Sequence, residues 1–167
     1  MKSIIFDLDQ TLVDSSISSQ ERKNRNWSNV YSMIPNFILY DGCREVFKFI
    51  NEHRIKVALV STAPNVYATK VAAYYQIPQN VIIGYHDAKP IKPHPASFFK
   101  AIELLGETPE NIISFGDRLI DIQAAQAANV ISVACLWGSQ EVFQLNQSNA
   151  DFIISKPIEM ITLLQSH

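Results

Sequence analysis

The sequence predicts an α/β domain in which helices cover both faces of a doubly wound, mainly parallel sheet. Short apolar runs of strand length alternate with segments of helix length along most of the chain, a pattern typical of right-handed βαβ units. Three of these runs are followed closely by an oxygen-bearing side chain, at Asp7, Ser61 and Asp117. Because such folds bind ligands beyond the carboxyl ends of their strands, these residues are candidates for a binding site.

The first predicted strand is the apolar run that begins at Ser3 and stops at two carboxylates, Asp7 and Asp9. Alternate residues at a strand end can direct two carboxylates toward one small volume, which suits metal binding or acid–base chemistry. The alternative is that both residues are solvated turn residues that close the strand. The rest of the chain has to decide between these interpretations.

The segment behind this strand is the one region without a clear hydrophobic period. Residues 14–26 are polar and residues 27–40 carry scattered aromatics. From there the pattern becomes regular: a helix is predicted over residues 43–53 and a strand over residues 56–61.

Helices and strands continue to alternate through the remainder of the chain. Helices are predicted over residues 65–75, 95–105, 118–128 and 158–164, and strands over residues 81–84, 112–115, 130–134 and 152–154. Gly106 and Asn129 follow two of these helices, at the position where a left-handed residue often ends a helix.

The composition is that of an ordinary globular enzyme. The 167 residues suit a single domain, 1–167, with a core that needs no disulfide. A formal charge of −2 gives no broad attraction to nucleic acid or to an anionic membrane. Cys43 and Cys135 lack zinc-like spacing, so we expect reduced, inert thiols. With no apolar stretch near the ~20 residues that span a bilayer, we expect a soluble, cytoplasmic protein without a membrane partner.

Four motifs in a fixed order make the chain resemble the haloacid dehalogenase-like superfamily, in its phosphatase branch with a minimal cap. They are Asp7-Leu8-Asp9-Gln10-Thr11, Ser61 at a strand end, Lys92-Pro93-His94-Pro95, and Gly116-Asp117-Arg118-Leu119-Ile120-Asp121. The resemblance covers nearly the whole chain outside residues 15–39 and implies a Rossmann-like core. Two positions depart from the family pattern: Gln10 replaces a common Gly or Asn, and Thr62 replaces a frequent Asn.

The resemblance implies a phosphoryl-transfer site. It assigns Asp7 as the nucleophile that forms an aspartyl-phosphate, and Asp9 as the acid and base that serves the leaving group and then water. It implies Mg²⁺ held by Asp7, the backbone carbonyl of Asp9, and Asp117. On the residues alone, Asp117 has an alternative role as the cap of the helix that follows it.

Further motif residues are expected to bind the phosphate or to support the site. By resemblance, Lys92 supplies positive charge, and Ser61, with its neighbour Thr62, contacts phosphoryl oxygens. Asp121 lies one helical turn after Asp117, where it can reach the metal through water or hold Lys92. Its alternative role is to complement the positive end of the helix dipole.

The presence of Asp9 distinguishes among the reactions of this superfamily, because its dehalogenases lack the second aspartate. We therefore predict a Mg²⁺-dependent phosphomonoester hydrolase. A phosphomutase is one alternative, although this chain has little room for the lid that keeps water out. A noncatalytic module that binds phosphate is another.

The short insert at residues 15–39 predicts a flap or minimal cap over an open site. Such a site suits a bulky substrate: a phosphorylated nucleic-acid end, a phosphoprotein or a large metabolite. The insert carries Arg22, Lys23 and Arg25 beside Trp27, a group able to hold a polyanion. The favoured interpretation is a solvated flap anchored by Trp27. No oligomeric state is predicted.

Overall fold

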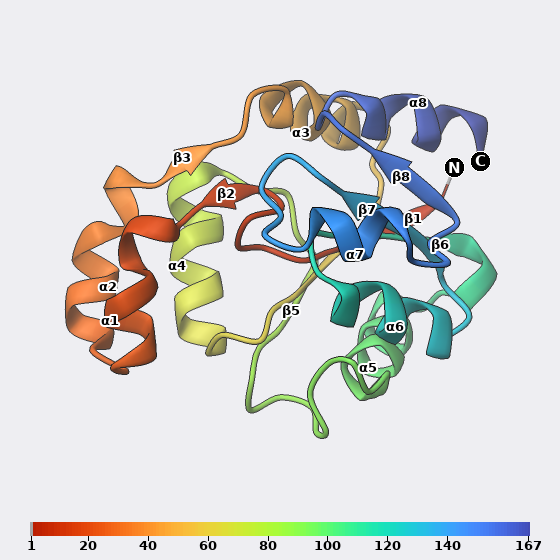
Figure 1. Ribbon diagram of the computed structural model, residues 1–167. Coiled ribbons are helices and arrows are strands. Elements are labelled where there is room, and N and C mark those ends of the chain that lie inside the picture. Colours follow the sequence, from red (N-terminus) through yellow and green to blue (C-terminus); the bar gives the residue numbers. More distant parts are fainter. Residues whose placement is uncertain (1) are drawn as a thin grey trace.

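The computed structural model describes residues 2–167, and its centre is a six-stranded sheet in which every strand is parallel to its neighbours (Figure 1). The strand order is β5-β4-β1-β6-β7-β8. Their bounds are β1 Ser3–Phe6, β4 Val57–Val60, β5 Val81–Ile83, β6 Ile112–Gly116, β7 Ile131–Cys135 and β8 Phe152–Ile154. The predicted doubly wound, Rossmann-like fold is therefore confirmed.

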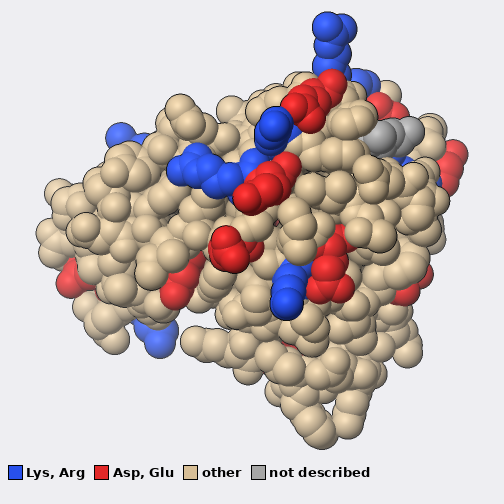
Figure 2. Space-filling view, turned by 90° about the horizontal axis from the view of Figure 1, so that it is seen from above, with Lys and Arg blue, Asp and Glu red and all other residues tan. Residues whose placement is uncertain are grey.

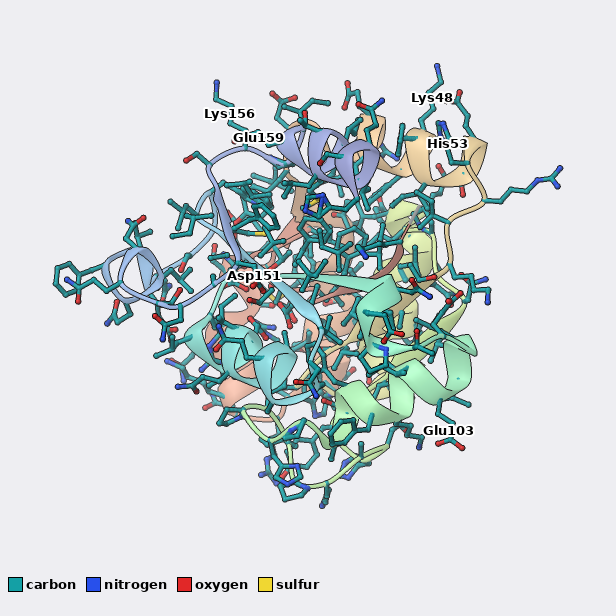
Figure 3. The ribbon with its side chains drawn as sticks, turned by 90° about the vertical axis from the view of Figure 1, so that its right-hand side faces the viewer. Lys48, His53, Glu103, Asp151, Lys156 and Glu159 are labelled. Carbon is teal, nitrogen blue, oxygen red and sulfur yellow. The ribbon has the colours of Figure 1, made fainter. Side chains whose placement is uncertain are left out.

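Helices cover both faces of this sheet, as Figures 1 and 3 show from two directions. The helices are α3 Cys43–Glu52, α4 Asn65–Tyr75 and α8 Glu159–Ser166 on one face, and α5 Ala96–Leu105 and α6 Leu119–Ala127 on the other. In Figure 3, Lys48 of α3 and Glu103 of α5 point away from the sheet on opposite sides of the molecule.

Alternating side chains of the strands build the two cores. In β1, Ile4 and Phe6 pack under α3, α4 and α8, whereas Ile5 packs against α5 and α6. The strand is fully buried because both faces of a parallel sheet are covered, which explains its continuous apolar sequence.

The insert contains two short helices, α1 Ser19–Lys23 and α2 Trp27–Met33. Its entry and exit are joined by the antiparallel pair β2 Val13–Asp14 and β3 Ile38–Leu39. Val30 and Ile34 bury their side chains in the core that includes α4. The Tyr75 hydroxyl of α4 donates to the carbonyl oxygens of Ile34 and Phe37 at 2.7 and 2.6 Å. The insert is thus packed on the domain by both apolar and polar contacts.

The ends of the predicted helices follow their stop signals. Gly106 (φ 64°) and Asn129 (φ 57°) both adopt the left-handed conformation. The short helix α7 Val142–Asn146 was not predicted, because five residues give too little periodicity. Within residues 2–167, no helix combines the length and apolar character required to cross a membrane.

Candidate active site

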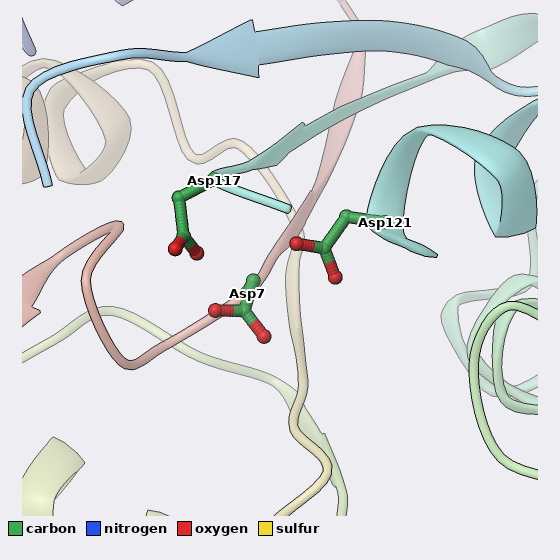
Figure 4. A group of neighbouring side chains, drawn as sticks. All are labelled: Asp7, Asp117 and Asp121. Carbon is green, nitrogen blue, oxygen red and sulfur yellow. The ribbon is translucent and has the colours of Figure 1, made fainter. Parts of the chain in front are cut away.

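Three carboxylates converge beyond the carboxyl ends of the two central strands. Asp7 follows β1, Asp117 follows β6, and Asp121 lies in the first turn of α6. One oxygen of each lies within 4.8 Å of the others, and Figure 4 shows the three groups facing a common space. The cluster lies between β1 and β6, where the strand order reverses: β1 is followed by its neighbour β4 on one side, and β6 by its neighbour β7 on the other. This is the usual ligand position in such sheets.

Lys92 joins two of these carboxylates. Its Nζ atom donates to Asp7 Oδ1 at 2.8 Å, to Asp121 Oδ1 at 2.6 Å and to the Val60 carbonyl oxygen at 3.0 Å. The ammonium group is buried, and the two carboxylates hold its pKa above the usual range despite that burial. The lysine therefore remains charged at the base of the site.

The cluster carries more negative than positive charge. Burial, together with the neighbouring acids, raises the pKa of Asp7 to about 7 and that of Asp117 to about 9. Lys92 opposes this rise but cannot balance three carboxylates. An oxygen-only set with excess negative charge is the donor set that a hard divalent cation prefers, so these residues fit Mg²⁺.

The turn between β6 and α6 fixes the two acids of the fourth motif. A Cβ atom at Gly116 would lie 2.4 Å from Asp121 Cβ, so only glycine allows this close approach. Asp121 Oδ2 accepts a hydrogen bond from the Arg118 backbone N–H at 3.0 Å. Asp117 Oδ1 accepts one from Thr11 Oγ1 at 2.9 Å. Asp121, and not Asp117, therefore accepts the hydrogen bond at the start of α6.

Asp9 lies beside the cluster, and its carboxylate has a separate set of partners. The hydroxyls of Ser15 and Tyr67 each donate to Asp9 Oδ1 at 2.5 Å. Arg22 Nη1 of the insert lies 2.9 Å from Asp9 Oδ2. The Arg22 guanidinium also lies 5.7 Å from the centre of the Tyr67 ring. The insert thus reaches the second carboxylate of the first motif directly.

Ser61 follows β4 at the same edge of the sheet. Its backbone N–H donates to the Ile83 carbonyl at 2.9 Å, and its Oγ atom accepts the Ala63 N–H at 3.0 Å. These bonds fix the loop that carries Thr62.

A cavity of about 790 Å³ opens above these groups. All seven residues selected from the sequence line it: Asp7, Asp9, Ser61, Thr62, Lys92, Asp117 and Asp121. Arg22, Lys23, Arg25 and Trp27 of the insert line it as well. The interpretation of the insert as only a solvated flap is therefore wrong for Arg22, which pairs with Asp9 because α1 packs beside that carboxylate. Trp27 also packs near Tyr31 and Tyr67, with ring centres 6.3 and 5.7 Å away.

Sequence reasoning missed Ser15 and Tyr67 as partners of Asp9. Tyr67 lies on a predicted helix shortly after Ser61, and that position was the only available signal. Cys43 and Cys135 are buried, unbridged thiols, and burial raises the pKa of both.

The fold and this site define an α/β protein with a Rossmann-like core and an acidic centre at the carboxyl edge of its sheet. A model of the haloacid dehalogenase-like hydrolase family matches residues 20–129. The chain belongs to this family, and the predicted membership is confirmed.

Curated relatives of this chain are named as phosphatases. Pyrophosphatase PpaX of Oceanobacillus iheyensis is 27% identical over 94% of this chain and 72% of its own length. Phosphoglycolate phosphatase of Aquifex aeolicus is 33% identical over 53% of this chain and 40% of its own length. The match thus spans less than half of the second relative. These names agree with the phosphatase class predicted from the motifs.

Solved structures share the fold. A predicted phosphoglycolate phosphatase from Haemophilus somnus 129PT superposes with a TM-score of 0.84 at 21% identity, covering 99% of this chain and 98% of the other. CbbY from Rhodobacter sphaeroides, solved in complex with phosphate, gives a TM-score of 0.81 at 14% identity, covering 96% of each chain. At these identities the likeness concerns the fold.

Proposed function

We propose that this protein is a Mg²⁺-dependent phosphomonoester hydrolase that acts through an aspartyl-phosphate on Asp7. The observation that carries the proposal is the convergence of Asp7, Asp117 and Asp121, with one oxygen of each within 4.8 Å of the others. The buried ammonium of Lys92 pairs with two of them, Asp7 and Asp121. The proposal treats residues 1–167 as one catalytic domain and residues 15–39 as its short cap.

Two of the proposed metal ligands, the carboxylates of Asp7 and Asp117, already lie together. Asp7 and Asp117 offer carboxylates, and Asp9 offers its backbone carbonyl. Asp121 serves mainly to hold Lys92, since its Oδ1 atom lies 2.6 Å from that ammonium. When bound, Mg²⁺ would reduce the repulsion between the phosphate and the carboxylates and polarise the phosphoryl oxygens.

In the first step a carboxylate oxygen of Asp7 attacks phosphorus, and the bond from phosphorus to the leaving oxygen breaks. Asp9 in its protonated form gives its proton to that oxygen, which departs as an alcohol, and Asp9 is left as the carboxylate that Arg22, Ser15 and Tyr67 hold. Lys92 and the Ser61 hydroxyl compensate the charge on the phosphoryl group.

In the second step a water molecule attacks phosphorus, Asp9 takes a proton from that water, and the bond from Asp7 to phosphorus breaks. Inorganic phosphate leaves and both aspartates return to their initial states. Ser15 and Tyr67 hold Asp9 through its Oδ1 atom, so the proton carrier is oriented before substrate arrives.

Substitution of the proposed nucleophile tests the mechanism. We expect p-nitrophenyl phosphate to be hydrolysed with Mg²⁺, and Asp7→Asn to lower kcat by about a thousand-fold or more, because an amide is a poor nucleophile. Mass spectrometry after acid quench should detect one phosphoryl group on Asp7 of the wild type and none on Asp7→Asn.

Asp41→Asn is the matched control and should keep the kcat of the wild type, because Asp41 is an exposed aspartate outside the cavity. Full activity of Asp7→Asn would refute the mechanism. Formation of a sugar bisphosphate from a sugar phosphate would indicate the phosphomutase instead. The bulky substrate expected for an open site stays a prediction, as does the cytoplasmic location.

A further inference from the structure

The active-site cavity collects a large share of the basic residues of the chain. Its 20 lining residues include six of the 14 lysines and arginines, although they form only about an eighth of the 167 residues. The six are Arg22, Lys23, Arg25, Lys89, Lys92 and Arg118. By contrast, Figure 2 shows basic and acidic side chains interspersed on the face formed by α3 and α8.

Three of these cations already have carboxylate partners. Lys92 pairs with Asp7 and Asp121, Arg22 with Asp9 at 2.9 Å, and Arg118 with Glu141 at 3.6 Å. Their charges are therefore largely compensated by the protein.

The other three cations are Lys23, Arg25 and Lys89. Among residues 2–167, none of them has a carboxylate oxygen within 4.0 Å. Lys89 lies instead over the ring of Tyr85, 5.2 Å from its centre. Lys23 and Arg25 come from the insert, whereas Lys89 comes from the loop after β5, so separate parts of the chain bring uncompensated positive charge to one cavity.

The backbone at Arg25 supports a role for its side chain. Arg25 has φ 56°, a left-handed conformation in which glycine is favoured. Its N–H donates to the Arg22 carbonyl at 3.0 Å, so the conformation belongs to the turn that ends α1. The turn would accept glycine readily, yet it carries an arginine that lines the cavity.

We infer that the substrate is a small phosphate compound, in place of the bulky one that an open site predicts, and that it has a second anionic group. Lys23, Arg25 and Lys89 bind this second group while the phosphoryl group lies at Asp7. The inference rests on the proposed function, because Lys92, Ser61 and the metal provide for a single phosphate. The second group is a carboxylate or a second phosphoryl group, since both match ammonium and guanidinium donors. A nucleic acid is less suitable, because the uncompensated cations gather in one cavity instead of forming a long track.

Three compounds with the same three-carbon chain test this inference. Propyl phosphate has no second anion, 3-phosphonooxypropanoate has a carboxylate, and propane-1,3-diol bisphosphate has a second phosphoryl group. We expect kcat/KM to be about ten-fold or more higher for at least one of the anionic compounds than for propyl phosphate. Whichever anionic compound has the higher kcat/KM shows whether the second anionic group of the substrate is a carboxylate or a phosphoryl group.

The variants Arg25→Gly and Lys89→Ala should each lower that ratio by about five-fold or more. Arg25→Gly is the sharper variant, because glycine suits φ 56° and removal of the guanidinium leaves the turn intact. Lys48→Ala is the control: Lys48 is exposed on α3, outside the cavity (Figure 3), and its removal should leave the ratio unchanged.

The possible failures are distinguishable. Equal kcat/KM for all three compounds, or an unchanged ratio in both variants, would overturn the second-anion site and leave the phosphatase proposal standing. A 5′-phosphorylated oligonucleotide hydrolysed in preference to the bisphosphate would also overturn it. If the protein hydrolyses none of these compounds, the proposed function itself is contradicted.

Discussion

Asp9 is held by three side chains that come from three separate parts of the chain. Ser15 follows β2, Arg22 belongs to α1, and Tyr67 belongs to α4. The carboxylate therefore depends on the docking of the insert on the domain, whereas the Asp7, Asp117 and Asp121 cluster depends on the central sheet.

The hydroxyl of Tyr67 gives a residue-scale prediction. Tyr67→Phe removes the hydrogen bond to Asp9 Oδ1 but keeps the buried ring. We expect kcat to fall about ten- to a hundred-fold, because Asp9 loses part of its orientation. The dissociation constant of Mg²⁺, measured by calorimetry, should stay the same, since Tyr67 is not part of the carboxylate cluster.

Tyr74→Phe is the matched control on the same helix, where the tyrosine is 54% exposed. Tyr74→Phe should leave both kcat and the dissociation constant of Mg²⁺ unchanged. An unaltered kcat in Tyr67→Phe would show that this hydroxyl does not position the acid.

At the scale of elements, the turn between β6 and α6 has no room for a side chain at Gly116. Gly116→Ala would bring a methyl group to within 2.4 to 2.7 Å of Asp121 side-chain atoms. We expect a loss of about 2–4 kcal/mol in the free energy of unfolding, because the contact involves a buried residue in a tight turn. Urea unfolding of the wild type and of Gly116→Ala measures this difference in the free energy of unfolding.

Gly106→Ala provides the comparison. Gly106 has φ 64° but open space around its missing Cβ, so the expected loss is only about 1 kcal/mol. Equal losses in the two variants would mean that close packing against Asp121 is unimportant.

The length and burial of each element explain which elements the sequence could predict and which it could not. The long helices were predicted because burial of one side imposes a helical period on the sequence. The central strands were predicted because burial of both faces leaves a short continuous apolar run, as at Ile4, Ile5 and Phe6. The helices α1 and α2 have five and seven residues and gave no such pattern. Contacts such as Arg22 to Asp9 arise only when distant segments pack together, so no local signal announces them.

For the whole molecule, the acidic centre makes stability depend on pH in the absence of metal. The raised pKa values of Asp7 and Asp117, about 7 and 9, mean that the folded protein binds more protons than the unfolded chain, whose acids titrate near 3.8. Their contribution is fully present below that value and is lost as the pH rises through 7 and 9. In EDTA, we expect Tm to fall by about 5–10 °C between pH 5 and pH 9.

Added Mg²⁺ should reduce this fall, because a bound cation compensates the ionised acids. Asp117→Asn should make the metal-free protein less sensitive to alkaline pH, since one titrating acid is removed. Scanning calorimetry at matched ionic strength measures all three cases. A metal-free Tm that rises toward pH 9 would contradict the charge balance described for the cluster.

The ion pair between Arg22 and Asp9 also bears on how such an enzyme can change. Arg22 lies on the same short helix as Lys23 and three residues before Arg25, so one turn of chain touches both the acid that exchanges protons and the region proposed to select substrates. A substitution that reshapes the insert for a new compound will therefore also disturb Asp9. Selectivity and turnover are therefore linked in this protein wherever a change in the insert moves Arg22 away from Asp9.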